Sequence, residues 1–118
     1  MLKIALMMLT LTADGAVRLT LSEAEDLEDC QGAMLAVTSV LEAGGYTVLA
    51  AECGPTDLTL TPFNHGATAA EERHLYRVEI AGEGDYTVTP LAEGGSCEPA
   101  IEASPAVWCT RSSQAVVQ

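Results

Sequence analysis

The sequence predicts a disulfide-stabilised α+β domain in which one long helix packs on a small antiparallel sheet of about four to five strands. Three observations lead to this prediction: one segment with helical periodicity, several short segments with alternating apolar residues after it, and four cysteines. Strands that follow a single helix through short connections are typical of the α+β class. A regular alternation of strands and helices, which would indicate a doubly wound parallel sheet, is missing.

The length and charge of the chain limit the kinds of protein to which it can belong. Its 118 residues fit one domain, since domains have roughly 100 to 200 residues. The 17 acidic residues outnumber the 5 basic residues and produce a formal net charge of −12. Lys and Arg supply the affinity of proteins for phosphate backbones, so this balance argues against a nucleic-acid-binding protein. The apolar fraction of 48% indicates a folded core rather than an acidic disordered tail.

Residues 1–15 allow two interpretations. A single lysine, the apolar run Ile4–Leu11 and the small residues around Gly15 have the pattern of a secretory signal peptide that is cleaved after Gly15. In the alternative, Leu2–Leu11 is a buried strand and the Asp-Gly pair that follows is the turn of a hairpin. The apolar run is too short to span a bilayer, which needs about 20 residues. In either case, residues 16–118 are expected to form the single α+β domain.

The long helix is expected from Ser22 to Ala43. Ser22 and Glu25 have the spacing of a capping box, and Gly44 follows as a residue that favours helix ends. Apolar residues recur between these ends at spacings of three and four, and this stripe is expected to face the sheet. The stripe consists of Leu27, Cys30, Met34, Val37 and Leu41.

Alternating apolar residues predict the strands that follow the helix. They are expected at 46–53, 58–61, 74–81 and 86–91. Gly and Asp residues favour a hairpin turn between the last two of these strands. Tyr76, Val78 and Ile80 are expected to face inward.

Three segments without a clear pattern complete the chain. Residues 63–73 are expected to form a loop with one helical turn. Residues 92–111 are rich in Gly, Ser, Pro and Glu and are expected to be an irregular segment closed by a disulfide. The last residues, from 110 to 118, are expected to be a loose tail, with an edge strand at 115–117 as the alternative.

Geometry favours one pairing of the four cysteines. Cys30 lies roughly 21 Å back along the helix from Gly44, and Cys53 lies roughly 26 Å forward along the following strand. If that strand runs antiparallel to the helix, the two cysteines reach the same level and pair. Cys97 then pairs with Cys109. Persistent disulfides indicate an oxidising compartment, so a periplasmic or secreted protein is expected.

The alternative for the cysteines is a cytoplasmic protein with four reduced, buried thiols. No Cys-x-x-Cys motif is present, so neither a zinc site nor a thioredoxin-type redox pair is indicated. His65 and His74 are the two histidines, and no nucleophile motif or phosphate-binding loop accompanies them. No catalytic residue, cofactor or metal ion is therefore expected.

Five residues are candidates for contact with a partner. The single tryptophan lies in the expected irregular segment and is of a type enriched at binding hot spots, with packing on the neighbouring disulfide as the alternative. Two candidates share the loop at 63–73, since loops carry many binding residues. Two belong to the acidic start of the helix, where the helix dipole alone already favours acids. These candidates are Trp108, Phe63, His65, Glu23 and Asp26.

The function expected from these observations is a small exported, non-enzymatic binding or accessory module. Its acidic surface would steer it toward a protein partner with a basic surface. One alternative is an uncleaved structural subunit of a larger multiprotein assembly, with residues 2–12 buried as a strand or against a partner. Another is a small hydrolase that uses His65 or His74 with an acid. The sequence carries no signal for an oligomeric state.

Overall fold

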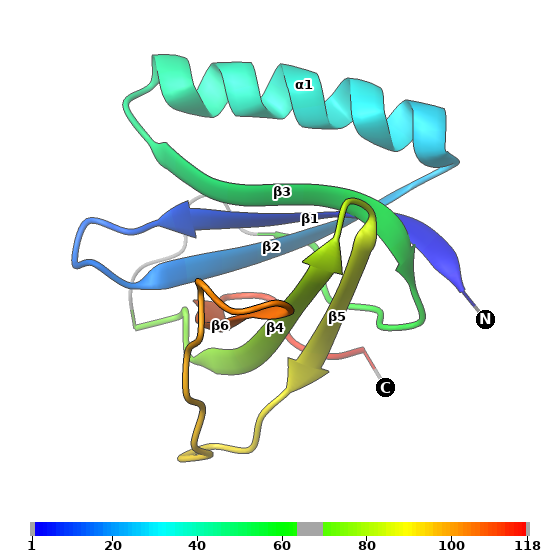
Figure 1. The fold of residues 1–118 in the computed structure, drawn as a ribbon. Helices are drawn as coiled ribbons and strands as arrows, with labels where there is room; N and C mark the ends of the chain where they lie inside the picture. The colour runs from blue at the N-terminus through cyan, green and yellow to red at the C-terminus, as the bar shows by residue number, and fades with distance from the viewer. Residues whose placement is uncertain (1, 64–69, 118) are drawn as a thin grey trace.

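The structure is a computed structural model that describes residues 2–63 and 70–117 (Figure 1). Six strands and one helix follow one another along the chain. They are β1 (Lys3–Leu11), β2 (Val17–Ala24), α1 (Leu27–Ala43), β3 (Thr47–Thr56), β4 (His74–Gly82), β5 (Asp85–Pro90) and β6 (Ala106–Ser112).

The predicted fold class is wrong. The six strands form one mixed sheet in the order β3-β1-β2-β6-β4-β5, in which β2 and β6 run parallel and the other neighbours antiparallel. The sheet curves until β3 and β5 approach each other at Gly54 and Gly84, so it is nearly closed into a barrel. The α+β prediction failed because the main core lies inside the curved sheet and not beneath the helix. That core includes Met7, Leu9, Leu19, Tyr76 and Val78.

Strand β1 lies in the interior of the sheet and is buried on both faces. Met7 and Leu9 point into the main core, whereas Leu6 and Met8 pack on the other face with the disulfide-bonded cysteines and residues of α1. Strands buried on both faces have nearly continuous apolar sequences, which explains why this strand resembles the apolar part of a signal peptide. β1 and β2 form an antiparallel hairpin in which the pairs run from Ile4–Ala24 to Leu11–Val17, the arrangement that the hairpin alternative describes.

The helix is shorter and more exposed than expected. Ser22 belongs to β2, where it pairs with Leu6, and the helix begins after Asp26, whose carboxylate accepts the backbone N–H of Asp29 at 2.7 Å. Cys30 is the residue of α1 that is fully buried. Two residues of the predicted apolar stripe, Leu27 and Val37, are 47% and 40% exposed. The helix covers one outer side of β1 and β3 (Figure 1), and a small second core forms there.

The sheet consists of two antiparallel halves, β3-β1-β2 and β6-β4-β5, which meet along two seams. At the first seam, β2 and β6 share a single pair of residues in register, Arg18 and Arg111. At the second seam, β3 meets the turn between β4 and β5. Each seam therefore has few backbone hydrogen bonds between strands, and side chains must supply the rest of the contact.

The C-terminal part of the chain is more regular than expected. The expected irregular segment 92–111 contains most of β6, and Ala100 forms an isolated bridge with Val107. The strand expected at 58–61 is reduced to a bridge between Leu60 and Val116. This bridge also fixes the C-terminal tail to the rest of the fold. The helical turn expected within 63–73 falls partly outside the described residues.

Candidate functional site

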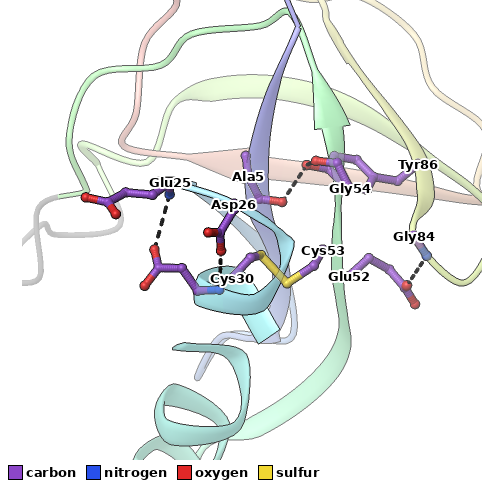
Figure 2. The surroundings of a disulfide bond; sticks show 10 residues. Ala5, Glu25, Asp26, Cys30, Glu52, Cys53, Gly54, Gly84 and Tyr86 are labelled. Atoms are coloured by element: carbon purple, nitrogen blue, oxygen red, sulfur yellow. Dashed lines mark hydrogen bonds between the residues drawn. A yellow bond between two sulfur atoms is a disulfide. The ribbon is translucent and has the colours of Figure 1, made fainter. Parts of the chain in front are cut away.

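Both predicted disulfides are confirmed. Cys30 pairs with Cys53 and Cys97 pairs with Cys109, each with a Cα–Cα distance of 5.9 Å. Cys30 and Cys53 are 0% and 6% exposed, and their bridge attaches α1 to β3 (Figure 2). The two disulfides favour an oxidising environment for the protein.

A close contact between β3 and the β4–β5 turn lies beside the buried disulfide (Figure 2). A Cβ atom added to Gly54 would stand 2.2 Å from the carbonyl oxygen of Gly84, so only glycine fits. The Glu52 carboxylate accepts the backbone N–H of Gly84 at 2.8 Å. The Tyr86 hydroxyl donates to the Ala5 carbonyl at 2.9 Å and lies 3.2 Å from the Gly54 carbonyl. We call Glu52, Gly54, Gly84 and Tyr86 the glycine seam.

Burial changes the pKa of the tyrosine in the glycine seam. Removal from water raises the pKa of Tyr86 to about 12, because burial disfavours the phenolate. The hydroxyl therefore stays protonated and remains a hydrogen-bond donor at any physiological pH.

Ion pairs join the two halves at the other seam, where Arg18 of β2 bonds the segment before β4 and Arg111 of β6 bonds the β1–β2 turn. Arg18 donates two hydrogen bonds to the Glu72 carboxylate, at 2.6 and 2.8 Å, and the side chain of Glu72 is only 3% exposed. On the neighbouring strand, Arg111 donates to both carboxylate oxygens of Asp14 at 2.9 and 2.7 Å. Each of the two adjacent arginines is thus neutralised by its own acid.

These contacts shift the pKa values of both acids downward. Hydrogen bonds from the Thr12 hydroxyl and then from Arg111 lower the pKa of Asp14 to about 2. The hydrogen bonds from Arg18 lower the pKa of Glu72, against the opposing effect of burial. The carboxylate forms are therefore favoured in the folded state.

Gln114 completes this seam, and sequence reasoning missed it. Its side-chain amide accepts the backbone N–H of Leu21 at 2.9 Å and donates to the Leu21 carbonyl at 3.0 Å, as a residue of a neighbouring strand would. It also donates to the Thr61 carbonyl, and its own carbonyl accepts the Tyr76 hydroxyl at 2.6 Å. A buried, fully bonded glutamine in a polar tail carries no local sequence signal. We call Asp14, Arg18, Glu72, Arg111 and Gln114 the polar seam.

The start of α1 carries an exposed group of acids. Glu25, Asp26, Glu28 and Asp29 are exposed, and α1 contains no basic residue. We call these four residues the acidic end. Glu23 lies beside them but forms an ion pair of 2.9 Å with Lys3. The helix dipole favours acids at this position, so part of the clustering has a structural cause.

The few basic residues of the chain do little to offset these acids. Four of the five are already in ion pairs within the chain. Those pairs are Lys3–Glu23, Arg18–Glu72, Arg77–Glu79 and Arg111–Asp14.

A groove of about 430 Å³ runs between α1 and the outer face of β1 and β2. Its apolar lining includes Met8, Val37, Leu41, Tyr46 and Phe63. The charged residue in the lining is Arg18, which the polar seam already neutralises. The groove is thus a largely apolar channel on the same side of the first half as α1.

The structure separates the candidate contact residues that the sequence suggested. Phe63 lines the groove, and Asp26 belongs to the acidic end, where it also caps the helix. Trp108 instead lies in β6 in register with Val78 and packs against the main core. Cys109 is one residue further along the strand, so its side chain lies on the opposite face. His65 lies outside the described residues.

His74 is the histidine that the structure describes, and it lines neither the groove nor the acidic end. His74 lines a separate pocket with Arg73 and Glu93, but its imidazole has no hydrogen bond with a described residue. Residues 2–63 and 70–117 contain no group of three or more His, Cys, Asp or Glu residues that could hold a metal ion. Within the described ranges, no helix has the length and apolar character needed to cross a membrane.

The described residues thus present two surface features on the first half, the acidic end and the groove. Comparison of the chain with protein-family models, with curated proteins and with solved structures finds no match.

Proposed function

We propose that the protein is a small exported, non-enzymatic binding module that engages a protein partner with a basic surface. The observation that carries this proposal is the acidic end, where four exposed acids lie together without a basic residue in the helix that bears them. Because most basic side chains are already paired inside the chain, the acids dominate the outer electrostatic field. Such a field speeds the encounter with a basic partner and repels acidic ones.

The proposed compartment is the periplasm or the extracellular space. The two disulfides support it, since such bonds persist in oxidising compartments. Cleavage after Gly15 would remove β1, which pairs with both β2 and β3 and fills both cores. We therefore expect Lys3–Leu11 to be retained in the folded protein, so the proposed export rests on the disulfides and not on cleavage of residues 1–15. An intact-mass measurement on protein from the source cell tests this, and a mature N-terminus at Ala16 would contradict it.

The two alternatives receive less support. The assembly subunit was expected to bury residues 2–12 as a strand or against a partner, and β1 is buried as a strand within the chain, so this segment gives no reason to require a partner. The hydrolase requires a histidine bonded to an acid. His65 lies outside the described residues, and His74 shares a pocket with Glu93 without a hydrogen bond to it.

Affinity capture with matched variants tests the proposal. The variant E25Q/D26N/E28Q/D29N removes four charges from the acidic end, while the amide oxygens introduced by D26N and D29N still accept the capping hydrogen bonds. The control variant E83Q/E93Q/E98Q/E102Q removes four charges from other exposed acids. We expect a basic protein from the native compartment to bind the wild type and the control at low salt and to be lost from the acidic-end variant. Equal retention by both variants would overturn the proposal.

A further inference from the structure

We propose that the groove between α1 and β1–β2 is the docking site for a segment of a partner protein that carries an aliphatic side chain and a basic side chain. This inference rests on the proposed function and assigns its binding surface. The aliphatic side chain enters the groove, and the basic side chain meets the acidic end.

Exposed apolar side chains are concentrated on α1 and the turn that follows it. Of nine exposed large hydrophobic residues in the described chain, five lie at positions 27–46. Two of them line the groove, Val37 and Tyr46, which are 40% and 52% exposed. Val40, which is 71% exposed, lies three residues from Val37 along the helix. A gathering of exposed apolar residues next to an apolar channel is typical of a protein-binding surface.

The position of the acidic end relative to the groove defines how far apart the basic and aliphatic side chains of the partner must be. Ser22 of β2 lines the groove, and Glu25 and Asp26 follow it three and four residues later in the connection to α1. The acids stand outside the lining, and Asp26, Glu28 and Asp29 border a separate open pocket at the start of the helix. Asp29 and Val37 are eight residues apart on the helix, or roughly 12 Å. A matching partner places its basic side chain at about that distance from its aliphatic one, roughly four residues apart in an extended segment.

Charge argues against a second copy of this chain as the occupant. Each copy has a net charge of −12, and a symmetric contact through this surface would bring two acidic ends near each other. Like charges across an interface disfavour association. A basic partner gains attraction from the same arrangement, so the groove and the acids select the same class of ligand.

The helix itself offers a matched control. Leu35 is 71% exposed, as Val40 is, but lies roughly 160° around the helix from Val37, on the flank away from the groove. The test variants are V37S/V40S, which makes the groove side polar, and L35S, which makes the other flank polar. All three positions are exposed, so both variants are expected to fold, and the two disulfides and circular dichroism verify that they do.

The probe is a synthetic peptide of lysine and leucine, compared with a peptide of the same charge in which serine replaces leucine. Nitrogen–proton NMR spectra of the full chain are recorded during titration at low and high salt. We expect the leucine peptide to shift the amides of α1 and of β2 around Ser22, with affinity lowered about ten-fold by V37S/V40S and unchanged by L35S. High salt should weaken binding to the wild type more than to the acidic-end variant.

The outcomes separate this inference from the proposed function. If the acidic-end variant loses binding while V37S/V40S binds as the wild type does, the acidic end is a binding surface and the groove is not the docking site. If the serine peptide binds as tightly as the leucine peptide, the apolar part of the inference is likewise wrong. Concentration-dependent dimerisation that V37S/V40S abolishes would overturn it in favour of a second copy. If neither peptide binds at low salt, the proposed function fails with it.

Discussion

The polar seam and the glycine seam join the same two halves of the sheet with opposite chemistry. At the polar seam, β2 and β6 share one residue pair, and two arginines, two acids and a glutamine from these strands and the segments next to them bond the halves together. At the glycine seam, two backbones touch directly, and a buried tyrosine and a glutamate bond across the contact. The first depends on the charge of its side chains, whereas the second depends on the absence of a side chain. The two should therefore respond to different perturbations.

The largest expected effect comes from adding volume at the glycine seam. In Gly54→Ala the new Cβ would meet the backbone oxygen of Gly84 at 2.2 Å, and neither backbone can give way without loss of other contacts. We expect the free energy of unfolding to fall by about 3 kcal/mol, measured by urea denaturation. Gly32→Ala is the control, because its Cβ would meet nothing within 4 Å in an exposed part of α1. It should raise stability by about 0.5–1 kcal/mol. Equal stability of the two variants would show that the halves do not touch at Gly54.

The next effect is expected at the polar seam. Glu72→Gln leaves Arg18 without its charged partner in a site where the acid is only 3% exposed. A loss of about 2 kcal/mol is expected. The double variant R18M/E72M replaces the pair by apolar side chains and should recover most of that loss, since buried ion pairs contribute little beyond apolar packing. If E72Q unfolds at the same urea concentration as the wild type, the ion pair does not hold this seam.

Two buried tyrosines allow a direct comparison of the seams with one chemical change. Tyr86→Phe removes the hydroxyl that bonds the Ala5 carbonyl, and Tyr76→Phe removes the one that bonds the Gln114 carbonyl. Each variant leaves a buried acceptor unsatisfied, so each should lose about 1 kcal/mol. Native-state hydrogen exchange should then show faster opening near β3 for Y86F and near Gln114 for Y76F. Identical exchange patterns in the two variants would contradict the idea of separate seams.

The smallest effect is a difference in pH dependence. The pKa values of Asp14 and Glu72 are lowered on folding, from 3.8 to about 2 for Asp14. Their contribution to stability is therefore complete above the unfolded values and is lost as the pH falls through the folded values. The urea midpoint should fall on acidification below about pH 5, less steeply in E72Q than in the wild type. The plot of urea midpoint against pH for Y86F should run parallel to that of the wild type. A parallel plot for E72Q would show that Glu72 does not contribute to the pH dependence of stability.

Local patterns predicted the local parts of the fold and missed the seams. The Cys30–Cys53 pairing followed from helix and strand lengths, and the inward positions of Tyr76 and Val78 followed from alternation. The parallel contact of β2 with β6 joins residues more than ninety positions apart and leaves no local pattern. Gly54 has no local sequence signal for this contact, although its lack of a side chain is what lets the halves meet.

The candidate site was predicted in part for the same reason. The acidic end is a local feature and was visible as a run of acids, but the pairing of four of the five basic residues with other acids depends on the fold. The groove could not be foreseen, because the predicted apolar stripe was assigned wholly to the core. In the structure, Met34 and Leu41 pack in the small second core, while Val37 stays 40% exposed at the groove.

Residue-resolved hydrogen exchange at neutral and acidic pH tests most directly the claim that two seams of different chemistry join the halves. The account predicts that acidification selectively lowers the protection of β2 and β6 amides at the polar seam, after correction for the intrinsic effect of pH on exchange. Amides within each half and at the glycine seam should keep their protection until global unfolding. Uniform loss of protection across all six strands in one step would contradict it.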